Sequence, residues 1–151
     1  MNTEQRAAVQ RLKELLTQQC DSFRDYLVIF DKQQIAIESA NTDDLLSYVD
    51  MEEQFVAEII CIQNVIDPLE NMYSFPVYEE GWNDVVFLKA ALEELKQQAV
   101  FKLSRNRELL SVRMAEIRRE IDILKSNPVI AGMRRSVHNQ YNTASMVDIR
   151  G

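Results

Sequence analysis

The chain has 151 residues, of which 46% are hydrophobic and 27% charged, and its formal net charge is −7. This length predicts one domain, and the composition excludes both a disordered chain and a membrane-spanning one, since runs such as "YLVIF" are far too short to cross a bilayer. The negative charge argues against nucleic acid as the main partner. We therefore expect a soluble, cytoplasmic protein that is not membrane-embedded.

The first third of the chain carries a heptad pattern. Apolar residues recur at alternating steps of three and four, which is typical of a helix with a coiled-coil stripe, and two glutamines interrupt them. The predicted stripe consists of Val9, Leu12, Leu16, Gln19, Phe23, Tyr26, Phe30, Gln33 and Ile37.

A tight turn is predicted at "ESANTDDLL". Asn41 or Thr42 can cap a second helix whose first turn carries Asp43 and Asp44, a favourable place for negative charge. Pro68 kinks or ends that helix. Its predicted buried stripe is Leu46, Val49, Val56, Ile59, Ile60, Gln63 and Ile66.

The two cysteines lie nearly equidistant from the predicted turn, so an antiparallel hairpin places Cys20 and Cys61 at the same level. Packed helix axes are about 8–10 Å apart, whereas a disulfide needs Cα atoms within about 7 Å. We therefore predict two buried free thiols that behave as small hydrophobic residues. Two cysteines also cannot form a disulfide framework, which agrees with a reducing compartment.

The third predicted helix is the longest and begins near Asn83 or Asp84, after the aromatic connector "MYSFPVYEEGW". At 1.5 Å per residue it would span roughly 60 Å, against about 45 Å for the second helix. Its predicted stripe is Leu88, Leu92, Leu95, Ala99, Leu103, Asn106, Leu110, Met114, Ile117, Ile121 and Leu124.

These elements predict an all-α fold. We expect an elongated antiparallel bundle of three long helices, a coiled-coil hairpin plus a longer third helix, over residues 1–126. Residues 127–151 are expected to form a short amphipathic helix and a flexible tail. Three helices leave one helix flank under-covered, so apolar surface remains for a fourth element or for a partner.

Catalytic chemistry finds no support in the sequence. The single histidine, His138, lies in the tail with no acidic residue near it, which disfavours a Glu-x-x-His metal bundle and any Ser/His/Asp or Cys/His constellation. Three widely spread glycines form no phosphate-binding loop. We expect no enzyme activity, no metal and no cofactor.

The C-terminal "NPV" is a good helix start, with Asn127 as the N-cap and Pro128 at the first helical position. Ile130, Met133, Val137 and Tyr141 then fall on one face of a short helix. Gly132 lowers the stability of that helix by about 1 kcal/mol relative to alanine. The segment either docks on the bundle as a fourth helix or becomes ordered when it binds a partner.

Two stretches resemble the FlgN family of flagellar export chaperones. "LSRNRELLSVRMAEIRREI" is similar to that family's last long helix, with an Asn followed by a Leu pair, here Asn106, Leu109 and Leu110. "ANTDDLLSYVDMEEQFVAEI" is similar to its first hairpin. The connector "MYSFPVYEEGW" departs from the family pattern, and it is interpreted either as a cap over one end of the bundle or as a second contact surface.

The resemblance implies a type III secretion chaperone that binds C-terminal segments of the hook-associated proteins FlgK and FlgL and brings them to the export gate component FlhA. It implies client binding at the end of the last helix and the tail, and a tyrosine that contacts the gate, for which Tyr141 is the candidate. On that helix, Met114, Ile117, Ile121 and Leu124 are expected to form the floor of a client groove.

The family comparison leaves the oligomeric state as a monomer or a weak homodimer. The same heptads would serve a homodimeric coiled-coil adaptor or scaffold that has no secretion client, and this is the alternative reading of the sequence.

Overall fold

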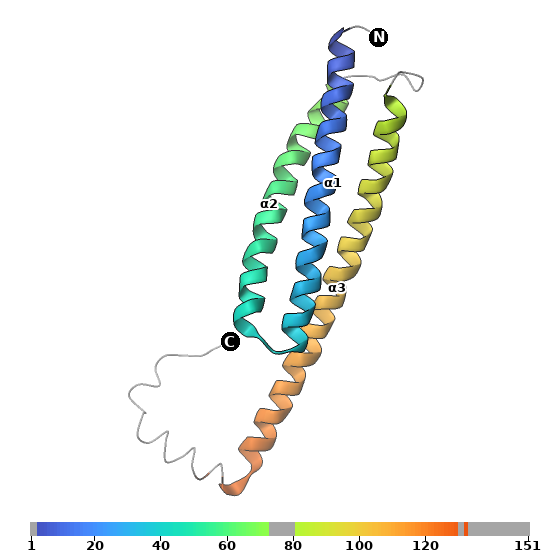
Figure 1. The fold of residues 1–151 in the computed structure, drawn as a ribbon. Helices are drawn as coiled ribbons and strands as arrows, with labels where there is room; N and C mark the ends of the chain where they lie inside the picture. Colours follow the sequence, from blue (N-terminus) through green and yellow to red (C-terminus); the bar gives the residue numbers. More distant parts are fainter. Residues whose placement is uncertain (1–2, 73–80, 130–131, 133–151) are drawn as a thin grey trace, which may run out of the picture. The chain divides into compact units, whose positions relative to one another are not determined.

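The computed structural model describes residues 3–72, 81–129 and 132, and the described chain is an all-α bundle (Figure 1). Its helices are α1 (Thr3–Glu38), α2 (Thr42–Met72) and α3 (Trp82–Ser126). The chain divides into two compact units, unit 1 from Met1 to Leu110 and unit 2 from Ser111 to Gly151, so α3 belongs to both. The predicted all-α class and the three helices are confirmed.

Helix α1 is the central element of unit 1. It has fifteen buried residues, whereas α2 has two and the whole of α3 has four. The reason is that α1 packs on both neighbours: Gln19 donates a hydrogen bond to the Ile59 carbonyl of α2 at 2.9 Å, and Asn106 of α3 donates to the Phe30 carbonyl at 2.9 Å. Eight of the nine predicted stripe residues of α1 are buried, and the ninth, Tyr26, is half-buried.

The turn between α1 and α2 is closed by two joined caps. Ala40 has a φ of 54°, and the amides of Ala40 and Asn41 donate to the carbonyls of Ile37 and Ala36, which is the Schellman arrangement that ends a helix. Asn41 then starts α2, because its side-chain oxygen accepts from the Asp44 amide at 3.1 Å and its Nδ2 donates to the Asp44 carboxylate. Of the two predicted N-cap candidates, Asn41 is therefore the residue that caps α2.

The start of α3 packs directly against α1. Val85 is fully buried, and Trp82 packs against the core at its edge. Gly81, just before the helix, has a φ of 87°, and a Cβ there would lie 3.3 Å from Cγ1 of Val9. A side chain at this position would therefore be both strained and crowded. Of the predicted connector "MYSFPVYEEGW", residues 73–80 lie outside the described residues.

The core of unit 1 runs through the α1 stripe and along α3 as far as Ala99 and Leu103. Its α3 members include Leu92, while Leu88, Leu95 and Leu103 are half-buried against it. From Leu88 to Asn106 this confirms the positions predicted to face the core, whereas the predicted Leu110 is 38% exposed. The α2 stripe was partly wrong: Leu46 and Ile60 are 59% and 53% exposed, whereas Ile62, which the pattern omitted, is buried.

Both cysteines are free, as predicted, but only Cys20 is buried. Its thiol faces α3, 3.8 Å from the Leu88 carbonyl, and burial raises the pKa of Cys20 above its ordinary value. Cys61 is exposed on α2, which corrects the expectation that both are buried. The Cys20 thiol thus contacts α3 in the core, whereas Cys61 is open to solvent.

Candidate functional site

The most distinctive surface of the described chain is an apolar stripe on the part of α3 that belongs to unit 2. We call this set the α3 stripe: Met114, Ile117, Ile121 and Leu124, which are 45%, 44%, 43% and 49% exposed. Their spacing of three and four residues places them on one face of the helix. Large apolar side chains at this spacing normally pack on a neighbouring helix, so their exposure marks an interaction surface.

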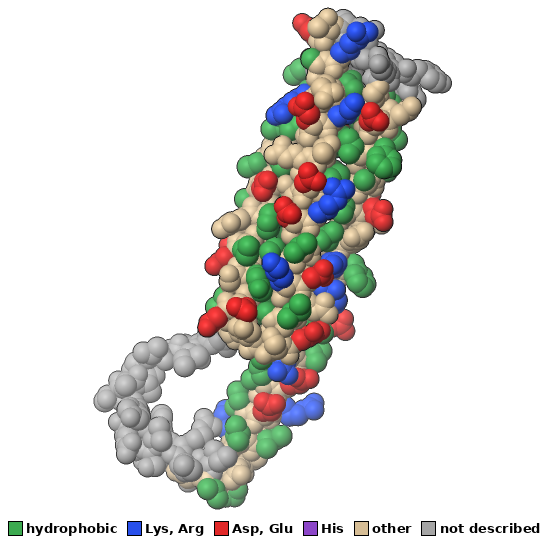
Figure 2. Space-filling model, in the orientation of Figure 1, with side chains coloured by type: hydrophobic (Ala, Val, Ile, Leu, Met, Phe, Trp, Pro, Cys, Tyr) green, Lys and Arg blue, Asp and Glu red, His purple; other side chains and the backbone are tan. Residues whose placement is uncertain are grey.

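The groove that the sequence analysis expects stays a prediction. Of its residues the structure describes the floor, on a stretch of α3 from Ser111 to Ser126 where almost every side chain is exposed and only Arg113 is half-buried. Among the described residues of unit 2, no second wall lies beside this floor. Figure 2 shows apolar and charged side chains lying open on this stretch of α3.

The residues that directly follow α3 form the helix start predicted from the sequence. The Asn127 side-chain oxygen accepts a hydrogen bond from the Val129 amide at 3.0 Å, and Pro128 and Val129 are helical. This is the N-cap expected from "NPV". The other predicted binding residues, Ile130, Met133, Val137 and Tyr141, lie outside the described residues.

The predicted family motif falls in unit 1 and has a structural role there. Asn106 is 4% exposed, and its Nδ2 donates to the Phe30 carbonyl at 2.9 Å and to Oε1 of Gln33 at 3.3 Å. Gln33 in turn donates to the Glu52 carboxylate of α2 at 2.9 Å. A polar layer thus joins all three helices, and a buried polar residue of this kind fixes the register of the helices. Leu109 is half-buried, and Leu110 is 38% exposed.

Ionic contacts extend this layer to the surface. Lys102 donates to both carboxylate oxygens of Asp31 at 2.6 and 2.7 Å, and Arg105 donates to the same carboxylate at 3.4 Å. The hydrogen bond from Lys102 is the main reason that the pKa of Asp31 lies below its ordinary value. On the inner side of the layer, burial and the neighbouring Glu52 carboxylate raise the pKa of Tyr26 to about 12.

The α3 stripe has basic side chains beside it. Arg118 lies four residues after Met114 and three before Ile121, and Lys125 lies four residues after Ile121, so both border the same edge of the stripe. Among the described residues, neither has a hydrogen-bond or ion-pair partner. The other edge carries Arg113, which pairs with Glu116 at 3.1 Å, and Glu120. The sequence analysis noted that bases outnumber acids between Lys102 and Lys125, but not that two of them border this stripe.

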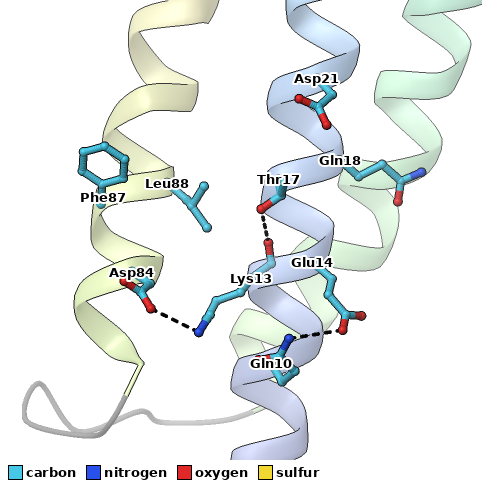
Figure 3. A pocket seen from close by; sticks show the side chains of 9 residues that line it. All are labelled: Gln10, Lys13, Glu14, Thr17, Gln18, Asp21, Asp84, Phe87 and Leu88. Carbon is cyan, nitrogen blue, oxygen red and sulfur yellow. Dashed lines mark hydrogen bonds and ion pairs between the residues drawn. The ribbon is translucent and has the colours of Figure 1, made fainter.

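A second candidate surface, an open pocket, lies in unit 1 between α1 and α3 (Figure 3). It is an open pocket of about 580 Å³ with Lys13 and Asp84 ion-paired at 3.1 Å across it. The side chain of Phe87, 73% exposed, stands at its edge. Heptad analysis missed Phe87 because the residue lies off the predicted stripe of α3.

Among the described residues, neither surface carries a cluster of metal-ligating side chains. Within residues 3–72, 81–129 and 132, no group of three or more His, Cys, Asp or Glu side chains could hold a metal ion. Within the same residues, no helix is both long enough and apolar enough to pass through a membrane. What the α3 stripe can do chemically is bury apolar area against another helix.

Comparison with known proteins gives one similarity without a described activity. The chain is similar to an uncharacterized protein of Treponema pallidum (strain Nichols), with 28% identity over 116 residues, which is 77% of this chain and 74% of that protein. No family model matches the chain. No solved structure matches it either.

Proposed function

We propose that this protein is a FlgN-type export chaperone of the flagellar type III secretion system. In this role it binds the C-terminal segments of hook-associated proteins of the FlgK and FlgL type and delivers them to the export gate component FlhA. The proposal rests on the resemblance of "LSRNRELLSVRMAEIRREI" and "ANTDDLLSYVDMEEQFVAEI" to that family, and it assigns client binding to the α3 stripe.

The observation that carries the proposal is the contrast between the two units. In unit 1 the residues of α3 that face the core, Val85, Leu92 and Ala99, are at most 6% exposed, whereas Val86, Phe87, Val100 and Phe101 lie outside the core and are 51–73% exposed. In unit 2 the four residues of the α3 stripe are 43–49% exposed. Water-exposed apolar side chains at helical spacing favour a protein that receives a helical segment from a partner.

Methionine and isoleucine suit such a role for a physical reason. The flexible thioether of Met114 can adapt to clients of different shape, and the branched side chains of Ile117 and Ile121 offer rigid apolar area. Neither binding nor delivery in this scheme requires a covalent step, so the residues act only by packing and by charge.

The proposal can be tested with two matched pairs of substitutions on α3. Ile117→Gln with Ile121→Gln removes the centre of the α3 stripe, whereas Val112→Gln with Ile123→Gln changes apolar residues that are as exposed, 52% and 61%, on the far side of the helix. Calorimetry with a hook-associated-protein C-terminal peptide should show affinity reduced about tenfold or more for the first pair. The second pair should bind like the unmodified chain.

Two results would contradict the proposal. One is that the unmodified chain binds no hook-associated peptide. The other is that both pairs of substitutions reduce binding equally. A constitutive dimer in light scattering that is indifferent to the peptide and dissociates on Ile117→Gln with Ile121→Gln would instead favour the coiled-coil adaptor, because the α3 stripe would then be a self-association surface.

A further inference from the structure

The ion pairs of unit 1 show how α3 recognises the helices packed on it. Lys89 lies four residues after the buried Val85 and three before the buried Leu92, and it pairs with Glu70 of α2 at 3.0 Å. Lys102 pairs with Asp31 of α1. In both cases a cation beside the apolar stripe of α3 meets a carboxylate on a neighbouring helix of the bundle.

The same arrangement occurs in unit 2 without the second helix. Arg118 stands to Met114 and Ile121 as Lys89 stands to Val85 and Leu92, at plus four and minus three, and Lys125 repeats this position one heptad later. Both cations are exposed and, within the part of the chain that the structure describes, unpaired. A cation in the last turn also interacts favourably with the helix dipole, which accounts for Lys125, but Arg118 lies more than two turns before the end of α3.

We infer that the helix received by the α3 stripe is an acidic amphipathic one, whose apolar face is bordered by carboxylates about one heptad apart that pair with Arg118 and Lys125. This inference rests on the proposed function and adds the chemistry of the client segment. Charge complementarity of this kind selects between partners that offer similar apolar faces. A client helix with basic residues beside its apolar face would be repelled by Arg118 and Lys125.

A second copy of the chain is a poor occupant for the same reason. In an antiparallel pair centred on the α3 stripe, Arg118 of one copy would face Arg118 of the other. In a parallel pair it would face Arg113 of the other copy, although Lys125 would then lie opposite Glu120. Like charges opposite each other along a helix pair oppose association, whereas a client helix with glutamate or aspartate at these positions removes the repulsion.

The test uses the full-length chain and two synthetic three-heptad amphipathic helices with the same leucine and isoleucine stripe. One peptide carries Glu and the other Lys at the positions beside the stripe. We expect the Glu peptide to bind roughly tenfold more tightly at low salt, with the preference shrinking as salt is added. Arg118→Glu with Lys125→Glu should abolish or reverse the preference.

Arg119→Glu is the matched control, because Arg119 lies two residues from both Ile117 and Ile121 and therefore on the far side of α3. It makes the same change of charge as Arg118→Glu and should alter either affinity less than about twofold. Circular dichroism of each variant checks that the helix content is retained.

Four outcomes overturn the inference: neither peptide binds, both bind equally, the Lys peptide binds better, or the preference survives the double reversal. Hook-associated peptides separate this result from the proposed function. If such a peptide binds and the double reversal has no effect on it, the inference fails while the function stands. If only the synthetic Glu peptide binds and the reversal abolishes this binding, the inference stands and the flagellar client is wrong.

Discussion

At the residue scale, Asn106 shows what the structure adds to a residue that the sequence already singles out. The sequence marks it as a polar interruption of an apolar stripe and as part of a family motif. The structure adds that its amide bonds the Phe30 carbonyl and Gln33 in a buried layer. An unpaired buried amide would lower stability, so the residue stays in register with α1 rather than facing a partner.

Ala40 provides a prediction at the same scale. Its φ of 54° is a conformation that costs an alanine about 1–2 kcal/mol, and glycine removes that strain while making the unfolded chain somewhat more flexible. Ala40→Gly should therefore raise the free energy of unfolding by about 0.5–1 kcal/mol, measured by urea denaturation.

The control for this prediction is Ala57→Gly, at an exposed helical position of α2, where glycine should instead lower stability by about 0.5–1 kcal/mol. A loss of stability at both positions would mean that the turn does not hold Ala40 in the left-handed region.

At the element scale, α3 changes character along its length. Its helical repeat of apolar residues, interrupted by the polar Asn106, continues from Val85 to Leu124, yet the buried members all lie before Leu110. The contact of Asn106 with Gln33 comes five residues before α1 ends at Glu38. About one and a half further turns of α1 therefore remain after that contact, and unit 1 ends at Leu110.

Two leucines on the same stripe of α3 test this change. Leu92 is 5% exposed and lies in the core, so Leu92→Ala should lower the free energy of unfolding by about 2–5 kcal/mol. Leu110 is 38% exposed, so Leu110→Ala should cost under about 1 kcal/mol. Urea denaturation of both variants gives the comparison.

The predicted apolar positions of α3 also include Leu95 and Leu103, which lie between these two leucines in the sequence. Leu95 and Leu103 are half-buried, so their truncation should cost an intermediate amount. Equal losses at Leu92 and Leu110 would show that the stripe is covered along its whole length.

At the scale of the whole molecule, the division into two units separates stability from binding. The buried core cluster lies between Val9 and Ala99. Removing residues 127–151 should therefore leave the melting temperature within a few degrees of its original value, a change equivalent to less than about 1 kcal/mol. If the proposed function is right, binding to a hook-associated peptide or to the cytosolic domain of FlhA should be lost.

Tyr141→Ala, in the full-length chain, is the finer form of the same experiment, because losing one aromatic anchor commonly costs about 2 kcal/mol or more in affinity. Unfolding of the shortened chain would assign the C-terminal segment to the bundle as a structural helix. A folded, shortened chain that binds both partners at full strength would remove the recognition role of the segment.

The sequence by itself determined the helices and most of the α1 stripe. Periodicity, the Asn41 and Asn127 caps and the absence of glycine and proline from the whole of α1 and α3 are local features, and local features set helix formation. The sequence also identified the α3 stripe. It predicted the wrong face for part of α2, because Leu46 and Ile60 look as apolar as Ile62 and only the position of α1 decides which of them is buried.

Only the tertiary structure decided which apolar residues have a partner. Met114 and Leu92 belong to the same helical repeat, so no local signal distinguishes them, and burial depends on where the neighbouring helices end. The same holds for charge: Lys89 and Arg118 occupy equivalent places beside the stripe, but Lys89 meets Glu70 while Arg118 is unpaired within the described residues. An apolar helical repeat specifies a face that is stabilised by packing on another helix. The lengths of the neighbouring helices decide whether the chain itself provides that helix.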